Sequence, residues 1–399
     1  MNPMTSFAQW FTPLRVATGL FSSATALLLI SLLGPAPSIA AAENSRKAID
    51  CPLRDQPYSL GSPLIDILLK PEAKAVVDRE MPTLLQKIPQ MFASTTPPSF
   101  GSIITLRTLA AYRRISEEAL TPIDASLAAL PITEADRIAR CARYDIERPR
   151  IDIPEGKPRV LLFEKITGFR DGPSVEAAGA AVRAMAVRNG WALVVTDKGG
   201  AIAPEILKKF DVLIWNNVSG DVLTLTQRRA FRNYIEHGGG FVGFHGSAGD
   251  PAYFWDWYVD TLIGARFIGH PQAPQFQDAK IDIENNSAIG RDLAPGWTMN
   301  DEWYSFETSP RAGDATIIAT LDESSYSPKG VMGQDLRMGD HPIAWTRCVG
   351  NGRVFYSAIG HRPESYSEPH HVALLEQAVV WAAGMGETRC NAGKEVARK

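Results

Sequence analysis

Two patterns of apolar and polar residues follow one another along the chain, and the change falls near residue 155. On the N-terminal side, apolar residues recur at the three- and four-residue spacing of one helix face. Prolines and short polar stretches separate these segments. The helices expected here cover 63–69, 73–77, 106–111 and 120–130, the last beginning at Thr121-Pro122. We therefore predict a small helical module over residues 43–150.

After a proline-containing linker at 151–158, apolar runs of strand length alternate with helical patterns. Strands alternating with helices predict right-handed βαβ units in a mostly parallel sheet flanked by helices. The expected strands are 160–163, 191–195, 212–215 and 241–244, with helices at 174–188, 204–209 and 226–237. Further strands at 316–320, 341–345 and 353–358, in part antiparallel additions, precede a closing helix at 371–383. This α/β domain is expected over 159–386, with a tail at 387–399.

The first 42 residues have the order of a targeting segment. Arg15 is their only ionisable side chain, and an apolar run from Val16 to Leu33 precedes the small residues Ala40-Ala41-Ala42. This order predicts a secretory signal peptide and a periplasmic or secreted protein. An uncleaved anchor is the alternative, but the dense apolar core at 26–33 is short for a membrane span. We therefore expect no stable membrane insertion after cleavage.

Charge and cysteine content narrow the class of protein further. Among 399 residues, 41 Lys and Arg balance 44 Asp and Glu, so a nucleic-acid partner is not expected. Secretion would place the four cysteines in an oxidising compartment, where three pairings are open. We favour Cys51–Cys141 and Cys348–Cys390, because each pair then falls within one structural unit. Their spacing lacks a CxxC pattern and does not indicate a zinc site.

A series of motifs in the α/β domain resembles the ThuA-like (trehalose utilisation) domain family. The motifs that carry the resemblance are Thr167-Gly-Phe-Arg170, Val218-Ser-Gly-Asp-Val-Leu223, Gly238-Gly-Gly-Phe-Val-Gly-Phe-His245, Asp301-Glu-Trp-Tyr304, His341-Pro-Ile-Ala-Trp345, Gly352-Arg-Val-Phe-Tyr356 and Gly360-His-Arg-Pro-Glu-Ser-Tyr366. The resemblance implies a flavodoxin-like, class I glutamine amidotransferase-like fold. The preceding helices resemble a helical module attached to secreted bacterial enzymes.

His245 follows a glycine-rich strand and precedes small residues, which predicts a strand-to-turn elbow that exposes one side chain. The resemblance implies that this position holds a cysteine nucleophile in the amidotransferases. An imidazole cannot form the same thioester, so glutaminase activity is not expected. His361 falls where the related fold keeps its triad histidine. Glu364, three residues later, is expected to face the same site and orient that imidazole.

Further candidates lie among aromatic residues. Asp301 and Glu302 precede Trp303 and Tyr304, and carboxylates beside aromatic rings suit a sugar, whose apolar faces stack while its hydroxyls need acceptors. A core aromatic cluster is the alternative interpretation. His270 and Arg170 are added as binding residues, Arg170 for an oxyanion or a hydroxyl. The family pattern usually has histidine after this arginine, where Asp171 stands here.

Two kinds of chemistry can use these groups. In the first, His245 and His361 act as general acid and base, with Glu364 or Glu302 setting their protonation. In the second, His245, His270 and either Glu302 or His361 hold a divalent metal. No HxH or HExxH spacing marks a metal site, so no cofactor follows from the sequence.

The predicted function is acid–base processing of a small carbohydrate, such as a keto-sugar or a disaccharide, by a hydrolase, lyase or isomerase. The substrate class follows from the resemblance and from the aromatic–acidic motif. A non-catalytic carbohydrate-binding or partner-docking protein is the alternative, favoured by the missing cysteine. The oligomeric state stays open.

Overall fold

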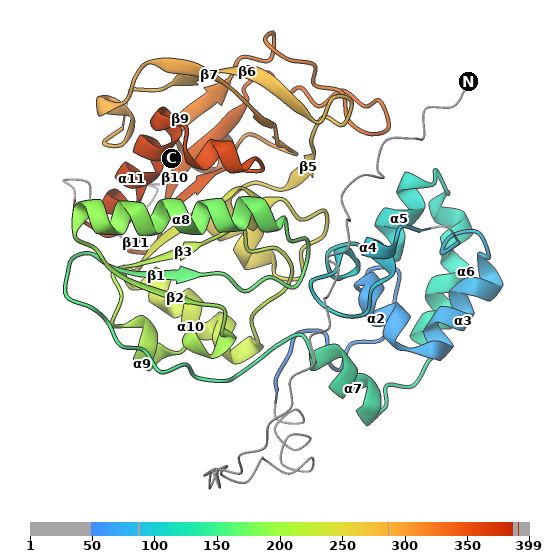
Figure 1. The fold of residues 1–399 in the computed structure, drawn as a ribbon. Coiled ribbons are helices and arrows are strands. Elements are labelled where there is room, and N and C mark those ends of the chain that lie inside the picture. The colour runs from blue at the N-terminus through green and yellow to red at the C-terminus, as the bar shows by residue number, and fades with distance from the viewer. Residues whose placement is uncertain (1–48, 87, 286, 386–389, 391–399) are drawn as a thin grey trace, which may run out of the picture. The chain divides into compact units, whose positions relative to one another are not determined.

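The computed structural model describes residues 49–86, 88–285, 287–385 and 390 (Figure 1). The predicted signal peptide at 1–42 and most of the predicted tail at 387–399 lie outside these residues. The described N-terminal part is helical and has its own apolar core, formed by residues such as Leu64, Val77 and Leu120. Its helices are α2 (Leu64–Leu69), α3 (Pro71–Glu80), α4 (Gln90–Ala93), η1 (Phe100–Ser102), α5 (Leu106–Tyr112), α6 (Glu117–Ala128) and α7 (Glu134–Cys141).

Helix α6 begins earlier than the sequence pattern indicated. The Ser116 side chain accepts a hydrogen bond from the Ala119 amide and caps the helix, which leaves Pro122 inside it. Proline lacks an amide proton and disfavours a helix interior, which is why Thr121-Pro122 looked like a start. The cap and the burial of Leu120 and Ile123 against the module core outweigh that cost, and the predicted start is wrong.

The second part is built on a nine-stranded mixed sheet in the order β2-β1-β3-β4-β11-β10-β9-β6-β7. The first five strands in this order pair in parallel, and the remaining pairings are antiparallel. The predicted α/β fold with a largely parallel sheet and antiparallel additions is confirmed. The strands are β1 (Arg159–Phe163), β2 (Ala192–Thr196), β3 (Val212–Trp215), β4 (Gly240–Phe244), β6 (Phe276–Ile283), β7 (Gly296–Glu302), β9 (Thr316–Leu321), β10 (Pro342–Val349) and β11 (Gly352–Ser357).

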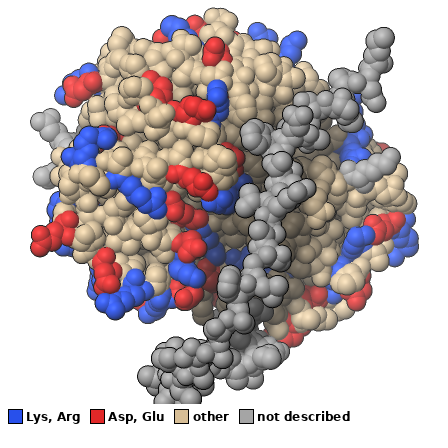
Figure 2. Space-filling model, viewed as in Figure 1, with Lys and Arg blue, Asp and Glu red and all other residues tan. Residues whose placement is uncertain are grey.

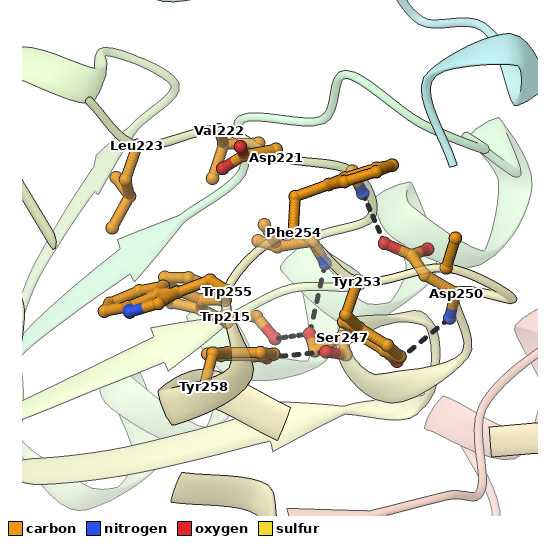
Figure 3. Close-up of a pocket in the computed structure, with 13 residues that line it drawn as sticks. Trp215, Asp221, Val222, Leu223, Ser247, Asp250, Tyr253, Phe254, Trp255 and Tyr258 are labelled. Atoms are coloured by element: carbon orange, nitrogen blue, oxygen red, sulfur yellow. Dashed lines mark hydrogen bonds between the residues drawn. The ribbon is translucent and has the colours of Figure 1, made fainter. Parts of the chain in front are cut away.

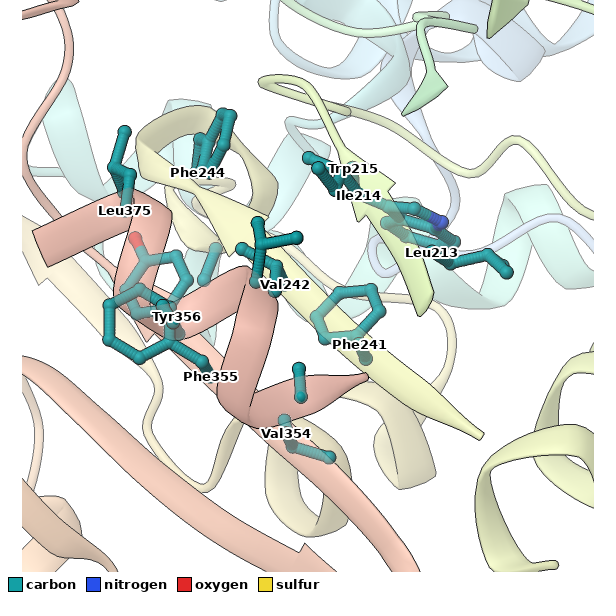
Figure 4. Packing of buried hydrophobic residues seen from close by; sticks show 14 of the residues in the cluster. Leu213, Ile214, Trp215, Phe241, Val242, Phe244, Val354, Phe355, Tyr356 and Leu375 are labelled. Carbon is teal, nitrogen blue, oxygen red and sulfur yellow. The ribbon is translucent and has the colours of Figure 1, made fainter. Parts of the chain in front are cut away.

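Helices cover both faces of the parallel half because its central strands are apolar on both sides. On one face of β4, Phe241 packs against Phe231 of α10. On the other face, the backbone of Gly240 lies so close to Ala382 of α11 that an added Cβ would clash. Figure 4 shows this core around β3, β4 and β11. The helices are α8 (Gly172–Asn189), α9 (Pro204–Leu207), α10 (Leu225–Glu236) and α11 (Pro369–Ala382).

The sequence pattern missed the β6–β7 hairpin and the small sheet of β5 (Phe267–Gly269) and β8 (Ser305–Phe306). Strand β6 is the second-last strand of the sheet. Several of its residues are polar and exposed, so it lacks the continuous apolar run that marks the central strands. These elements carry Glu302 at the end of β7 and His270 just after β5. They therefore matter to the site more than their weak pattern suggested.

Both favoured disulfides are present, Cys51–Cys141 within the helical part and Cys348–Cys390 within the α/β part. The two parts belong to one compact unit. The Tyr144 hydroxyl donates to Asp221 at 2.7 Å, and the Ser99 amide donates to the Thr167 carbonyl at 3.0 Å.

Basic and acidic side chains are interspersed on the face seen in Figure 2. No helix in the described part of the chain is both long enough and apolar enough to cross a membrane.

Candidate active site

His245 lies at a sharp turn directly after β4, with a positive φ of 29°. The turn is held because the Tyr356 hydroxyl donates to the His245 carbonyl at 2.7 Å. The imidazole Nδ1 lies 2.7 Å from the carbonyl oxygen of Ala358, which follows β11. A carbonyl only accepts, so Nδ1 carries the proton and Nε2 faces the other site residues. The predicted elbow is therefore present, with a buried imidazole at its tip.

Asp301 shapes the loop that carries His361. Its carboxylate accepts the backbone amides of Gly360 at 2.7 Å and of His361 and Arg362 at 3.1 Å. The Ser365 hydroxyl donates to the same carboxylate at 2.7 Å. Asp301 is fully buried and is engaged by this loop, so it positions His361 and does not reach a ligand.

Three donor atoms from separate parts of the fold converge beside the elbow. Glu302 Oε2 lies 3.1 Å from His361 Nδ1 and 3.4 Å from His245 Nε2, and the two imidazole nitrogens are 3.3 Å apart. Among the described residues, His245, Glu302 and His361 form the one group of three side chains whose ligand atoms lie close enough together to share a metal ion. Adjacent parallel strands bring His245 and His361 to one sheet edge, and β7 supplies the carboxylate.

His270 approaches the same carboxylate from the other side. Its Nδ1 lies 3.2 Å from Glu302 Oε1 and 2.8 Å from the Pro271 carbonyl, so Nδ1 is the protonated nitrogen. Gln275 Nε2 also donates to Glu302 Oε1. The Nε2 atoms of His270 and His361 have no hydrogen-bond partner among the described residues, and both atoms are accessible to solvent. One buried carboxylate thus holds two imidazoles that each present a free nitrogen.

The electrostatics of the site favour an ionised carboxylate. Burial raises the pKa of Glu302, but the contacts of its carboxylate with His245 and His361 and the nearby imidazole charges outweigh burial and hold the pKa well below its usual value. Burial lowers the pKa of His361, but the hydrogen bond and negative charge of Glu302 raise it above its ordinary value. Glu302 is therefore an ionised carboxylate, and the positive charge that balances it lies on the imidazole rings.

The other predicted site residues take different places. Glu364 is largely exposed and pairs with Arg362 at 3.3 Å, so Glu302 and not Glu364 orients His361. Trp303 is fully buried in the core, and its Nε1 donates to the Gln277 carbonyl at 2.8 Å.

Tyr304 packs against the site, whereas Arg170 lies on the surface and does not contact it. The Tyr304 ring stacks on His245 with centroids 4.1 Å apart and is buried, so it forms a wall behind the imidazole. Arg170 is partly exposed and lies 4.0 Å from Glu176. Its guanidinium makes no contact with the histidine–carboxylate cluster among the described residues, so it has the freedom of a surface side chain.

Two partly exposed phenylalanines flank His361 and were not singled out from the sequence. The ring centroid of Phe169 lies 6.0 Å from that of His361, and that of Phe276 lies 5.2 Å away. Their side chains are among the exposed large apolar groups, at 36% and 38%. Phe169 lies inside the Thr167–Arg170 motif, which was the available signal. Phe276 and Gln275 precede or begin a strand that the pattern missed.

A separate pocket beside the elbow contains Ser247 and Asp250 but none of the three clustered histidines (Figure 3). The Ser247 hydroxyl donates to the Trp215 carbonyl at 3.0 Å and accepts the Val218 amide at 3.1 Å. Asp250 accepts the Ser219 hydroxyl at 2.6 Å. These bonds fix neighbouring loops, so Ser247 is held in place as a structural residue and is not presented as a nucleophile.

The parallel half-sheet with a strand-end elbow defines a class I glutamine amidotransferase-like fold in which histidine occupies the elbow. The chain belongs to the ThuA family, described as trehalose utilisation, whose model matches residues 159–382. This description relates the family to carbohydrate.

Solved structures with similar folds include proteins assigned as ThuA-like. One from Bacteroides uniformis is 25% identical, with 58% of this chain and 94% of that chain covered and a TM-score of 0.49. One from Parabacteroides merdae is 16% identical, with 56% and 89% covered and a TM-score of 0.42. No curated protein matches the chain.

Proposed function

We propose that this protein is an enzyme that transforms a small carbohydrate, a keto-sugar or a disaccharide, by proton transfer at His361 and His270. The observation that carries the proposal is the bridge made by Glu302. Its two oxygens hold Nδ1 of His361 at 3.1 Å and Nδ1 of His270 at 3.2 Å, and both Nε2 atoms are left accessible. An imidazole oriented through Nδ1 and open at Nε2 is the arrangement that general acid–base catalysis requires.

One accessible nitrogen, His270 Nε2, acts as the base, and the other, His361 Nε2, acts as the acid. On a keto-sugar, His270 Nε2 takes the proton from the carbon next to the carbonyl, and the C–H electron pair becomes the enolate double bond. His361, protonated at both nitrogens, gives its Nε2 proton to the carbonyl oxygen and becomes neutral. His245 takes no part in this transfer, because its Nδ1 is bonded to Ala358 and its Nε2 faces Glu302.

The choice of carbohydrate is supported by the family description and by the rings beside His361. Phe169 and Phe276 offer partly exposed apolar surfaces with ring centroids 6.0 and 5.2 Å from that of the imidazole, and sugar rings stack on such surfaces. Glutaminase activity is not proposed, because the elbow residue His245 lacks a thiolate.

The proposal places the protein in the periplasm or outside the cell, after removal of residues 1–42. Two disulfides in the described residues support an oxidising compartment. The apolar run that predicts the signal lies outside the described residues.

The test is product formation followed by NMR. The protein is incubated with a panel of disaccharides and their keto derivatives, beside His361→Gln and His270→Gln. His237→Gln is the matched control, because His237 is an exposed histidine on the far end of α10 that contacts only the Asn233 carbonyl. We expect turnover by the wild type and the control, reduced about 10²–10⁴-fold in either site variant.

Equal turnover in all four proteins would contradict the proposed roles. Ligand line-broadening that survives in every protein, with no product from any member of the panel, would favour a carbohydrate-binding protein without turnover. The histidine at the elbow, in place of a cysteine, is the observation that keeps this second function in view.

A further inference from the structure

We infer that His245 Nε2, Glu302 Oε2 and His361 Nδ1 form a binding site for one divalent first-row transition-metal ion. The inference deepens the proposed function and rests on it for the use of the ion in turnover. Ion binding itself rests on the geometry of three side chains that come from the ends of β4 and β7 and from the loop after β11.

The three atoms form a nearly equilateral triangle with sides of 3.1, 3.3 and 3.4 Å. An ion with tetrahedral bonds of about 2.0–2.1 Å keeps its ligand atoms about 3.3 Å apart. Such an ion would lie just outside the plane of the triangle. Charge-assisted hydrogen bonds are shorter, about 2.7–2.9 Å, and link two atoms in a line. Three similar, longer distances therefore fit a shared ion better than a proton bridging two of the atoms.

The tautomer of His245 points to the same conclusion. Nδ1 donates to the Ala358 carbonyl at 2.7 Å, so a singly protonated His245 ring presents the Nε2 lone pair toward Glu302 Oε2. A lone pair facing a carboxylate oxygen is repulsive unless a cation lies between them. Metal-bound histidines characteristically donate their second ring N–H to a carbonyl or carboxylate, as His245 does here.

The carboxylate lacks a permanent cation. Among the described residues, Glu302 is paired with three histidines and with the Gln275 amide, and no lysine or arginine contacts it. Its side chain is only 2% exposed. A buried carboxylate is costly when its imidazole partners are neutral, and a divalent ion would then supply the compensating charge.

The donor set also selects the kind of ion. Two imidazole nitrogens and one carboxylate oxygen are the ligands of catalytic zinc sites and of ferrous facial triads, whereas Mg²⁺ and Ca²⁺ prefer oxygen alone. Three protein ligands leave at least one coordination position for water or a substrate oxygen. An ion on His361 Nδ1 would replace the proton there, so His361 Nε2–H would donate a hydrogen bond to the developing enolate oxygen without releasing its proton, and His270 would remain the base of the proposed reaction.

The experiment measures metal binding without any substrate. The protein is stripped with a chelator and titrated with Zn²⁺ by calorimetry and with Co²⁺ by visible absorption, beside Glu302→Gln and His245→Gln. Glu323→Gln is the matched control, because Glu323 is the carboxylate of a second buried histidine pair outside the cluster. Thermal unfolding of each protein verifies that it is folded.

We expect one equivalent of metal in the wild type and in Glu323→Gln, with a tetrahedral or five-coordinate Co²⁺ spectrum. Affinity should fall at least about 100-fold in folded Glu302→Gln or His245→Gln. No binding by the wild type, or equal binding by the folded site variants, would overturn the inference. Turnover of the sugar panel by the stripped protein would sustain the proposed function and overturn the use of the ion in it. Binding of one ion without any turnover would sustain the site and contradict the proposed function.

Discussion

Among the described residues, His341 with Glu323 and His361 with Glu302 are both largely buried histidine–carboxylate pairs, but their ring nitrogens are used differently. His341 Nδ1 contacts Glu323 at 2.8 Å, and its Nε2 lies 2.9 Å from the Tyr304 carbonyl, so both ring nitrogens are occupied. His361 Nδ1 contacts Glu302 at 3.1 Å, but its Nε2 has no partner among the described residues and reaches solvent.

The difference shows that burial and a charged partner do not by themselves make a histidine functional. His341 is fully saturated and holds Tyr304, which in turn stacks on His245. In His361, Nδ1 contacts Glu302 and Nε2 has no partner among the described residues. The Glu302 carboxylate also contacts the imidazoles of His245 and His270. The first arrangement stabilises a wall of the site, and the second leaves Nε2 of His361 free for a proton or a ligand.

The largest effect on turnover is expected from Glu302→Gln. The amide cannot hold two imidazole N–H groups as an anion does, so turnover should fall about 10³-fold, within the range of general acid–base effects. The free energy of unfolding should change much less, because the desolvation cost of the buried anion is removed together with its bonds. NMR product assays and chemical unfolding measure the two effects. A turnover loss matched by unfolding of the protein would contradict this assignment.

Asp301→Asn separates the neighbouring carboxylate from Glu302. Asp301 accepts the amides of Gly360, His361 and Arg362 as well as the Ser365 hydroxyl, and an asparagine cannot accept all of them. We expect the free energy of unfolding to fall by about 3–5 kcal/mol, as when a buried charged network is broken. Urea unfolding measures this change. A loss below about 1 kcal/mol would show that the loop does not depend on Asp301.

Asp250 is a buried carboxylate that lacks the histidines of Glu302. Burial raises its pKa to about 7, although hydrogen bonds from Ser219 and Gly220 lower it. The folded protein therefore keeps this proton between about pH 4 and pH 7 while the unfolded chain releases it. The contribution of Asp250 to stability should fall as pH rises through that window and stay constant above it.

Asp250→Asn mimics the protonated acid and should remove this pH dependence. Relative to the wild type, the variant should gain roughly 2–4 kcal/mol of stability between pH 4 and pH 8. Unfolding free energies of both proteins across that range give the difference directly. A constant difference would mean that Asp250 is ionised in the fold throughout.

The smallest effect is expected from Glu323→Gln. It weakens the bond to His341 and the contacts with the amides of Met338 and Gly339, at a partly solvated position. We expect a loss of about 1–2 kcal/mol in the free energy of unfolding and turnover within about twofold of the wild type. A large loss of turnover in a stable variant would show that the two histidine pairs are functionally coupled.

The sequence predicted most of the parallel half of the fold because its signals are local and strong. The run 212–215 and the run 241–244 are continuous apolar segments, and the capped helix α10 separates them. The antiparallel half was harder to predict. Strand β6 alternates polar and apolar residues and so lacks a continuous apolar run, and it pairs with β9 from nearly forty residues further along the chain.

The candidate site was predictable in part. His245 and His361 could be named because adjacent parallel strands end at the same edge of a sheet. Glu364 was expected beside His361 on sequence distance alone, but the short helix it occupies turns its side chain toward Arg362 and solvent. Glu302 lies fifty-nine residues from His361, and sequence spacing could not decide between the two carboxylates.

The sequence by itself determined the order of strands and helices in the parallel half of the sheet, the elbow at His245 and the absence of a cysteine nucleophile there. Backbone preferences and apolar periodicity act over a few residues, so they can be read locally. Only the tertiary structure decided that Glu302 joins His361 and His270 while Asp301 is used to hold a loop. The two carboxylates are neighbours in the chain, and their roles differ because successive side chains of a strand face opposite surroundings.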